Sequence, residues 1–520
     1  KCYFRDISLS KTQDLMEKYL LLLFLSCCGA FTICGAQTVT VRGRVIDRKT
    51  GEVLSDANVA DLVLGTGVAT NSYGLYSIHV KSKQCILRCS MLGYATKIDT
   101  LTLAVNMVHD FALMPDNYQL NDVEIVGERK FGGQLALTQK EIQSFPTLGS
   151  EPDVLKSLQY LPGVISGNEG TNNISVRGSD QWGNLVLLDE AMVYNPNHAL
   201  SFFSVFNNDA IQQVNLYKSY FPLMYGGRTS SVIDVRMREG NNQEKHRSAT
   251  IGVIASKLQL EGPIKRGKTS YLLSTRFAYP GAILGVLERF RGTKMNFYDI
   301  NAKINSTLND RNRFFFSIYN GGDHTYFNQL VRGYGMNWGN TTATFRWNHV
   351  LTDKTSGNLS AIFSNYYYRY KSMADGMKYL WKSNMQSYQL KYDVDYAFSN
   401  MLHIKSGLSG HTFTIMPGGI DNWGDLNNVV PYRMNRRRLL DIAAYGEISY
   451  EISPRWQFNG GIRLSTIYSP KVSTYKQKCY VMPEPRAELS YFPGKGDKLH
   501  VAFTQSSQSL HMLSNSSVGI

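Results

Sequence analysis

The feature that most constrains this chain is a two-residue alternation of apolar and polar side chains in its C-terminal half. From position 298 to 305 the apolar side chains are Tyr298, Ile300, Ala302 and Ile304, and the polar ones are Asp299, Asn301, Lys303 and Asn305. The pattern returns at 388–396 and at 402–411. Successive strand side chains point to opposite faces, so these segments are predicted to be strands with one apolar and one polar face. Tyrosine outnumbers phenylalanine, 32 to 24, which is unusual for the buried face of a soluble sandwich.

The connections between these segments alternate between short and long ones. Short links are expected near Pro263–Lys268, Asn309–Asn312, Thr352–Lys354, Ser399–Met401, Ser453–Arg455 and Pro493–Asp497. Long polar loops are expected at 279–294, 321–339, 371–385, 412–437 and 469–483. This alternation is typical of outer-membrane barrels. Residues 246–520 are therefore predicted to form part of an antiparallel transmembrane β-barrel, with two short strands between His246 and Gly262.

Length and composition favour several domains in a mainly β protein. A chain of 520 residues with 43% hydrophobic content exceeds one ordinary core, so two or three domains are expected. Past the N-terminus no apolar run is long enough for a spanning helix, and a membrane crossing would therefore use strands. The net charge of +14 is scattered, which favours a solvated lumen or a lipopolysaccharide-facing surface over nucleic-acid binding.

An apolar segment near the N-terminus, Met16 to Gln37, has the pattern of an export signal. We expect a signal peptide at 16–36, cleaved between Ala36 and Gln37, with residues 1–15 lying upstream of the true start. A short buried helix, or a lipoprotein site at Cys27 or Cys28, remains an alternative.

Three cysteines, Cys85, Cys89 and Cys479, remain after this cleavage. Cys85 and Cys89 would lie about 13 Å apart on one extended strand, too far for a disulfide, and are predicted to be buried thiols.

The segment 38–115 is predicted to be a small β-sandwich. Short strands at 41–46, 57–63, 74–80, 86–90 and 108–113 are separated by glycine-containing turns. Its motifs G-x-V-x-D-x-x-T-G-E, A-N-V, T-N-x-x-G-x-Y and G-Y resemble the carboxypeptidase-regulatory-like domain. The resemblance implies a periplasmic module without catalytic activity.

The segment 117–240 carries an ordered series of glycine-punctuated motifs. They are LPGV at Leu161–Val164, SVRG at Ser175–Gly178, LLDE at Leu187–Glu190, NPNH at Asn195–His198, DAIQQVNLYK at Asp209–Lys218 and YGGR at Tyr225–Arg228. In this order they resemble the plug of TonB-dependent outer-membrane receptors. The resemblance implies an α+β plug domain inside the barrel.

Six residues are selected as the plug motif: Arg177, Gly178, Asp189, Gly226, Gly227 and Arg228. The glycines permit tight turns and close backbone approach. Arg177 would place a permanent cation opposite a carboxylate of the plug or barrel wall. Alternatively, Arg177 is a solvated strand residue. Glu190 stands where the family usually has glycine, which leaves the geometry of the Asp189 turn open.

The stretch 121–130, NDVEIVGERK, resembles the TonB box, which pairs edge-on with a strand of an energising partner. The predicted box is Asp122, Val123, Glu124, Ile125 and Val126. β-Augmentation needs an extended segment with free backbone donors and acceptors, and this segment has the required β propensity. An ordinary edge strand is the alternative.

Catalytic function is not indicated by any motif. No nucleophile, metal or phosphate-binding pattern is present, so we expect no enzyme activity, catalytic residue, metal or cofactor. His198 and His411 could touch a ligand, although lone polar residues of this kind are usually solvated.

The resemblance implies TonB-dependent import across the outer membrane, with a periplasmic N-terminal domain. The expected partners are a TonB-type protein, outer-membrane lipid and lipopolysaccharide, an unknown imported ligand and a possible surface lipoprotein, but no nucleic acid. The alternative is a surface receptor or adhesin that binds or signals without transport. The ligand class stays open among siderophores, corrinoids, oligosaccharides and peptides.

The number of expected strands bears on the barrel. About twelve or thirteen strands fit between His246 and Ile520, whereas plugged barrels of this family have about 22. We therefore expect the chain to be a fragment whose barrel is incomplete and which would not insert alone.

Overall fold

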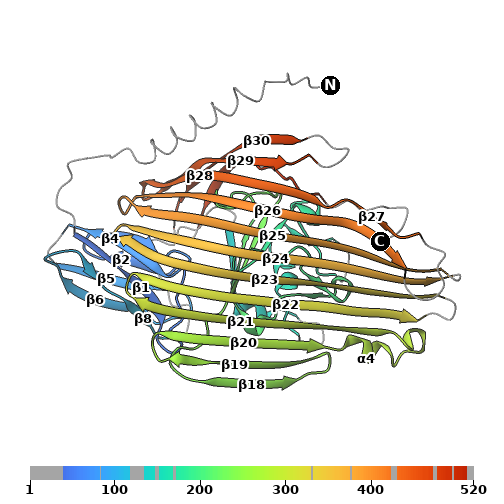
Figure 1. Ribbon diagram of the computed structural model, residues 1–520. Coiled ribbons are helices and arrows are strands. Elements are labelled where there is room, and N and C mark those ends of the chain that lie inside the picture. The colour runs from blue at the N-terminus through green and yellow to red at the C-terminus, as the bar shows by residue number, and fades with distance from the viewer. Residues whose placement is uncertain are drawn as a thin grey trace.

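The computed structural model describes residues 39–81, 84–116, 134–146, 151–167, 171–328, 332–374, 377–422, 430–471, 477–494 and 497–511. Strands dominate, in three units that follow one another along the chain (Figure 1), and this confirms the mainly β prediction. No described helix has the length and apolar content needed to cross a membrane. The predicted signal peptide and the predicted TonB box both lie outside the described residues.

The N-terminal unit is a β-sandwich of two sheets. Its strands are β1 (Val39–Asp47), β2 (Asn58–Asp61), β3 (Thr66–Ala69), β4 (Leu75–Val80), β5 (Gln84–Ser90), β6 (Lys97–Thr102), β7 (Met107–Val108) and β8 (Phe111–Leu113). One sheet contains β4, β1, β7 and β8, and the other contains β3, β2, β5 and β6. Val41, Leu87 and Phe111, all fully buried, belong to the core between the sheets. Cys85 and Cys89 are buried free thiols on β5, as predicted.

The second unit is a mixed α/β domain with its own apolar core. Its strands are β9 (Gln134–Thr138), β10 (Val164–Ser166), β11 (Ile174–Val176), β12 (Leu185–Leu188), β13 (Ala191–Met192), β14 (Asn197–His198), β15 (Phe203–Ser204), β16 (Ile211–Tyr217) and β17 (Val232–Met237). Its helices are α2 (Gln139–Ser144) and α3 (Val154–Gln159), with the 3-10 turns η1 (Gln181–Gly183), η2 (Ala199–Ser201) and η3 (Asn208–Ala210). The main sheet has the order β13-β12-β17-β16-β9, in which β12 and β17 are parallel. We call this unit the plug.

Both helices of the plug begin at side chains that cap them. The Thr138 hydroxyl accepts the N–H of Glu141, whose carboxylate accepts the N–H of Thr138 in return at 2.7 Å. At α3 the Asp153 carboxylate accepts the N–H of Lys156 at 3.0 Å. Such caps satisfy backbone donors that the helix itself leaves unpaired.

The third unit is a large antiparallel sheet, which we call the wall. Its strands are β18 (His246–Ile251), β19 (Ala255–Lys265), β20 (Thr269–Ala278), β21 (Lys294–Asn309), β22 (Asn312–Asn328), β23 (Arg332–Thr352), β24 (Thr355–Ala374), β25 (Met377–Ala397), β26 (Leu402–Asn422), β27 (Tyr432–Arg433), β28 (Arg437–Ser453), β29 (Trp456–Ser469), β30 (Lys478–Tyr491) and β31 (Leu499–Thr504). Helix α4 (Pro280–Leu284) and η4 (Glu288–Phe290) connect β20 to β21. The short strands β18 and β19 confirm the prediction for 246–262.

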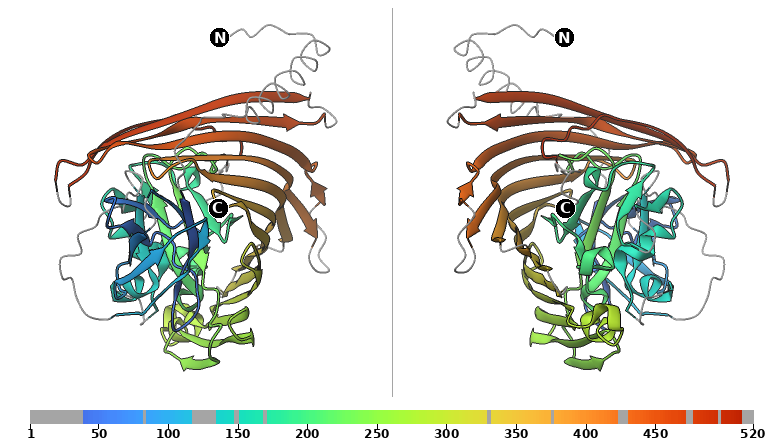
Figure 2. Two further views of the ribbon diagram at one scale, coloured as in Figure 1. Left: turned by 90° about the vertical axis from the view of Figure 1, so that its left-hand side faces the viewer. Right: turned by 90° about the vertical axis from the view of Figure 1, so that its right-hand side faces the viewer.

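The wall curves around the plug. Each long strand pairs with its neighbours in sequence, and β27 adds to the edge of β26. Figure 2 shows the plug on the concave side of the curved sheet. Among the described strands, β18 pairs only with β19 and β31 only with β30, so the sheet is open there.

Several expected long loops are strands instead. Residues 321–339 and 371–385 belong almost entirely to β22, β23, β24 and β25, and β23 stays in register with β24 from Arg332 opposite Ala374 to Val350 opposite Ser356. A strand of 21 residues spans roughly 70 Å, more than twice the hydrocarbon thickness of a membrane. The outer parts of such strands need no apolar face, which is why their polar sequences resembled loops.

The wall is polar on its concave face and apolar on its convex face. On β21, Asp299, Asn301 and Lys303 are at most 4% exposed, whereas Ile300 and Ile304 are 42% and 45% exposed. This arrangement is the reverse of a soluble protein, in which apolar side chains are buried. It confirms the alternation that the sequence predicted for this strand.

Candidate functional site

The seam between the plug and the wall is the candidate functional site, because charged side chains concentrate there. The plug contributes to it from the turn after β12 and from the loop around β14. The wall contributes inward-facing residues of strands β20 to β25, β28 and β30. Sequence separations of a hundred residues or more are bridged at this seam.

The turn after β12 is left-handed at two successive residues. Asp189 has φ 46° and Glu190 has φ 74°, values that are uncommon for residues other than glycine. Asp189 accepts the N–H of Met237 at 3.0 Å and pairs with Lys303 at 2.9 Å. The turn therefore forms despite the glutamate at 190, and its carboxylates hold it to the wall.

The Glu190 side chain joins three wall strands to the plug. Its carboxylate pairs with Arg346 of β23 and with Lys391 of β25, both at 2.9 Å, and accepts the hydroxyl of Ser360 of β24 at 3.0 Å. Burial alone would raise the pKa of Glu190, but Arg346 and Lys391 hold it well below its usual range. The residue that departs from the family pattern is thus a fully ionised anchor.

A second anchor is the buried imidazole of His198. It contacts Asp323 of β22 through Nδ1 and Asp299 of β21 through Nε2 at 2.7 Å, and it stacks on Phe297 at 4.4 Å. Burial alone would lower the pKa of His198, but the Asp323 and Asp299 carboxylates raise it to about 9. Asp299 also pairs with Arg276 at 2.6 Å. His198 is therefore a cation at neutral pH and is bound to the wall, rather than solvated.

A third set of contacts comes from the later strands. The Arg486 guanidinium donates to the carbonyl oxygens of Phe221, Pro222 and Tyr225 at 3.1, 3.1 and 2.9 Å. Glu447 accepts the Tyr220 hydroxyl at 2.6 Å. The wall thus holds the plug with charged groups along its whole curvature.

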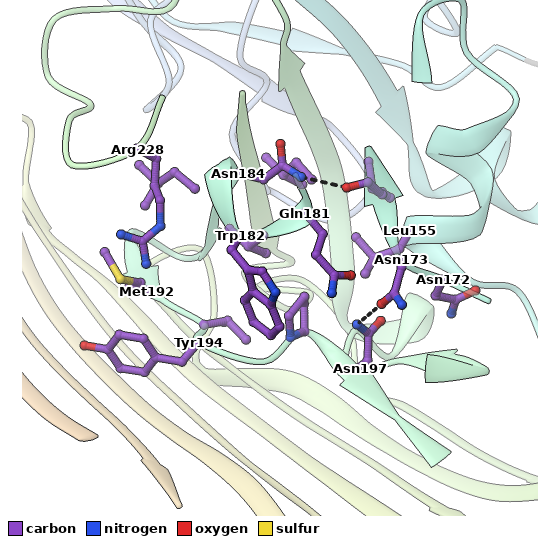
Figure 3. A pocket seen from close by; sticks show the side chains of 16 residues that line it. Leu155, Asn172, Asn173, Gln181, Trp182, Asn184, Met192, Tyr194, Asn197 and Arg228 are labelled. Atoms are coloured by element: carbon purple, nitrogen blue, oxygen red, sulfur yellow. Dashed lines mark hydrogen bonds between the residues drawn. The ribbon is translucent and has the colours of Figure 1, made fainter. Parts of the chain in front are cut away.

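A pocket lies on the plug beside the seam (Figure 3). It encloses about 570 Å³, part of it open to solvent, and its lining includes Trp182, Tyr194 and Arg228. Asn172 and Asn197 are among the lining residues, and their amide oxygens are buried and have no hydrogen-bond partner among the described residues. Unpaired buried acceptors are costly unless a donor reaches them. The pocket therefore offers aromatic rings and a cation to a ligand.

The predicted plug motif divides into turn residues and one exposed cation. Gly178 and Gly227 have φ 78° and 80°, which favours glycine, and a Cβ at Gly226 would lie 2.5 Å from Nε of Arg463. Arg177 is exposed, lies directly after β11 with φ 54°, and makes no ion pair within the described part of the chain.

The last residue of the motif, Arg228, lies in the pocket lining. It donates to the carbonyl of Gly227 at 2.9 Å, and burial lowers its pKa.

Sequence reasoning missed the residues of the wall that contact the plug. Asp323, Arg346 and Lys391 lie in segments whose polar character suggested loops or a wet barrel face, and nothing marked them as partners of the plug. A charged residue on the inward face of an alternating strand was the one available signal. Within the described ranges, no group of three or more His, Cys, Asp or Glu side chains could hold a metal ion.

Comparison with known families identifies two domains. Residues 41–125 match the CarboxypepD_reg-like domain, and residues 135–232 match the TonB-dependent receptor plug domain. No curated protein matches the chain in sequence.

Solved structures resemble the chain in fold. The copper transporter OprC superposes with a TM-score of 0.56 at 12% identity over 71% of this chain and 62% of its own. BauA, the ferric preacinetobactin receptor from Acinetobacter baumannii, gives 0.56 at 10% over 72% and 63%. The FrpB iron transporter from Neisseria meningitidis gives 0.54 at 13% over 73% and 65%. The chain thus spans less than two thirds of the length of these structures.

The plug domain match and the fold point in the same direction. The chain contains a carboxypeptidase-regulatory-like domain and a TonB-dependent receptor plug domain, and its curved wall has the barrel fold of TonB-dependent receptors.

Proposed function

We propose that this protein is a TonB-dependent outer-membrane transporter that imports a scarce ligand past a displaceable plug. The observation that most supports this proposal is the inverted polarity of the wall. Ile300 and Ile304 are exposed on its convex face, and Asp299 is buried against the plug. An apolar outer face suits lipid, and backbone pairing along the strands leaves few unsatisfied groups in it. The concave face holds the plug by charged contacts that water can replace.

The proposed energy source is a TonB-type protein of the inner membrane. The predicted box, Asp122 to Val126, falls between the sandwich, described to Asp116, and the plug, described from Gln134. A partner strand pairing there would pull on both domains. The proposal places the sandwich in the periplasm and the convex face of the wall in contact with outer-membrane lipid and lipopolysaccharide, and it allows a surface lipoprotein as a further partner.

The pocket of Figure 3 is the proposed point at which the plug contacts ligand. Amide side chains line the pocket at Asn173, Gln181 and Asn184, and they favour a ligand rich in hydroxyl or amide groups. Trp182 offers a ring for stacking, and Arg228 offers a cation to a weakly anionic group. Among siderophores, corrinoids, oligosaccharides and peptides, these features favour oligosaccharides and peptides as the ligand.

The test is transport by a variant with a blocked box. In the intact receptor, Ile125→Pro removes a backbone donor and disfavours strand pairing. We expect it to abolish uptake of labelled oligosaccharides or peptides that the wild type imports, while surface binding stays near wild type. Ile125→Val, which keeps the donor, is the matched control.

Uptake by wild-type cells should also stop when the proton-motive force is collapsed. Binding without any energy-dependent uptake, for every probe class including siderophores and corrinoids, would favour the receptor or adhesin alternative.

A further inference from the structure

The sandwich is docked on the end of the wall that carries the short turns. Arg42 of β1 pairs with Asp353, in the turn between β23 and β24, at 2.7 Å. Asn400, in the turn between β25 and β26, accepts the N–H of His79 at 2.6 Å and donates to its carbonyl at 2.7 Å. Figure 1 shows the sandwich at this end of the strands. The sandwich therefore covers one mouth of the space that holds the plug.

The sandwich also binds the plug directly, where the plug chain leaves β17. The buried Glu52 carboxylate accepts the backbone N–H groups of Glu239 and Gly240 at 2.7 and 3.1 Å. Thr50 accepts the N–H of Asn242 through its carbonyl at 2.7 Å. Because these donors are backbone groups, moving the plug segment after β17 away from Glu52 would break all of these hydrogen bonds.

A third contact joins the sandwich, the plug and the wall at the carboxylate of Glu190. The Tyr73 hydroxyl, in the turn before β4, donates to Glu190 Oε1 at 3.0 Å. The Tyr73 ring lies 5.3 Å from the guanidinium carbon of Arg346 and 5.9 Å from that of Arg236. Arg236 also donates to the carbonyl of Ser72 at 2.9 Å. The sandwich thus inserts one side chain into the charged seam that anchors the plug.

We propose that the N-terminal sandwich is a latch: it closes the short-turn mouth of the wall, and its release through Tyr73 and Glu52 is coupled to release of the plug. The two contacts lie on the ends of β12 and β17, which are parallel neighbours in the plug sheet. The latch proposal depends on the proposed function in one respect only, namely that a TonB-type protein supplies the pulling force. Tension on the segment between Asp116 and Gln134 acts on the sandwich and the plug together.

Hydrogen exchange in the intact receptor, without ligand or partner, tests this coupling. Tyr73→Phe removes only the hydroxyl and leaves the ring between its two arginines. We expect exchange at the Glu239 and Gly240 amides, which Tyr73 does not touch, to become about tenfold faster, as loss of a hydrogen bond to a charged group predicts.

The reciprocal variant is Glu52→Gln. It should accelerate exchange of the Met237 amide, which donates to Asp189 and not to Glu52, by a similar factor. Tyr94→Phe is the matched control, because the Tyr94 hydroxyl donates to Asp47 within the sandwich at 3.0 Å. We expect it to leave all three amides at wild-type rates.

Remote amides that stay at wild-type rates in both Tyr73→Phe and Glu52→Gln would overturn the latch, since the contacts would then open independently. The experiment involves no transport, so failure of the import proposal would leave its outcome unchanged. Conversely, the protein could show energy-dependent uptake while the remote amides keep wild-type exchange rates in both variants. The import proposal would then stand, and the latch proposal would be wrong.

Discussion

The interiors of the sandwich and the plug differ in kind from the seam between the plug and the wall. Inside the sandwich, Val41, Leu87 and Phe111 are fully buried apolar side chains. Along the seam, the fully buried side chains include Asp299 and Arg276, which pair at 2.6 Å. Both regions exclude water, but different chemistry holds them together.

This difference indicates which parts can separate. Opening an apolar core exposes surface to water at a cost proportional to its area, about 25 cal/mol per Å². Opening a seam of charges returns those groups to water, which solvates them well, so much of the lost pairing energy is recovered. The units should therefore stay folded while the plug moves relative to the wall.

The largest expected effect is in the sandwich core. Phe111→Ala leaves a cavity beside Tyr76, whose ring centre lies 6.1 Å away, and should destabilise the sandwich by about 3–5 kcal/mol. Hydrogen exchange across β1 and β8 in the intact protein measures the loss. The exposed Met114→Ala serves as control. If both variants exchanged like wild type, the sandwich would not depend on this core.

Alkaline pH should loosen the seam and spare the cores. The pKa of His198 is about 9 in the folded protein, against about 6.5 for an unperturbed histidine. Its stabilising contribution is therefore complete below pH 6.5 and is lost as pH rises through 9, by at most about 3 kcal/mol.

Exchange of the Ala199 amide, which donates to Asp323 at 2.7 Å, should accelerate over this range after correction for intrinsic rates. His198→Gln should remove the pH dependence, whereas the exposed His246→Gln should retain it. A pH-dependent loosening that survives in His198→Gln would assign the effect to another group.

Removing one seam charge should have a smaller effect. Asp299→Asn keeps the side-chain shape but leaves Arg276 and His198 without one of their carboxylates. We expect the plug to be held less firmly by about 1.5–3 kcal/mol, measured as faster exchange around β14 and η2 with no change in the sandwich. Asp497→Asn, in an exposed turn, is the control. If amide exchange in the sandwich accelerated equally, the effect would not be confined to the seam, and the difference between the apolar cores and the seam would be contradicted.

The smallest effect is expected at Arg177. The side chain is exposed and without an ion pair among the described residues, so Arg177→Gln should change plug stability by less than about 0.5 kcal/mol. Thermal unfolding of the intact protein measures this change. A loss comparable to that of Asp299→Asn would mean that Arg177 meets a carboxylate after all, as one reading of the sequence expected.

The strands themselves could be predicted well from the sequence, and some features less so. Strand β21 is visible in the alternation around Ile300, and the capping box is visible as Thr138 followed by Glu141. Strands β3 and β6 were missed because one is four residues long and the other is a half-exposed edge. The long hairpins were mistaken for loops because pairing of backbones needs no apolar pattern.

The sequence by itself determined which face of each alternating strand is polar, because this depends on neighbours one or two positions away. Only the tertiary structure decided which charges meet. His198 contacts Asp299, which is 101 residues away in the sequence, and Glu190 contacts Ser360, which is 170 residues away. Such pairing depends on the register of every intervening strand and on how the plug sits in the wall. The alternation of a strand fixes the direction of a side chain, but its partner depends on the assembled fold.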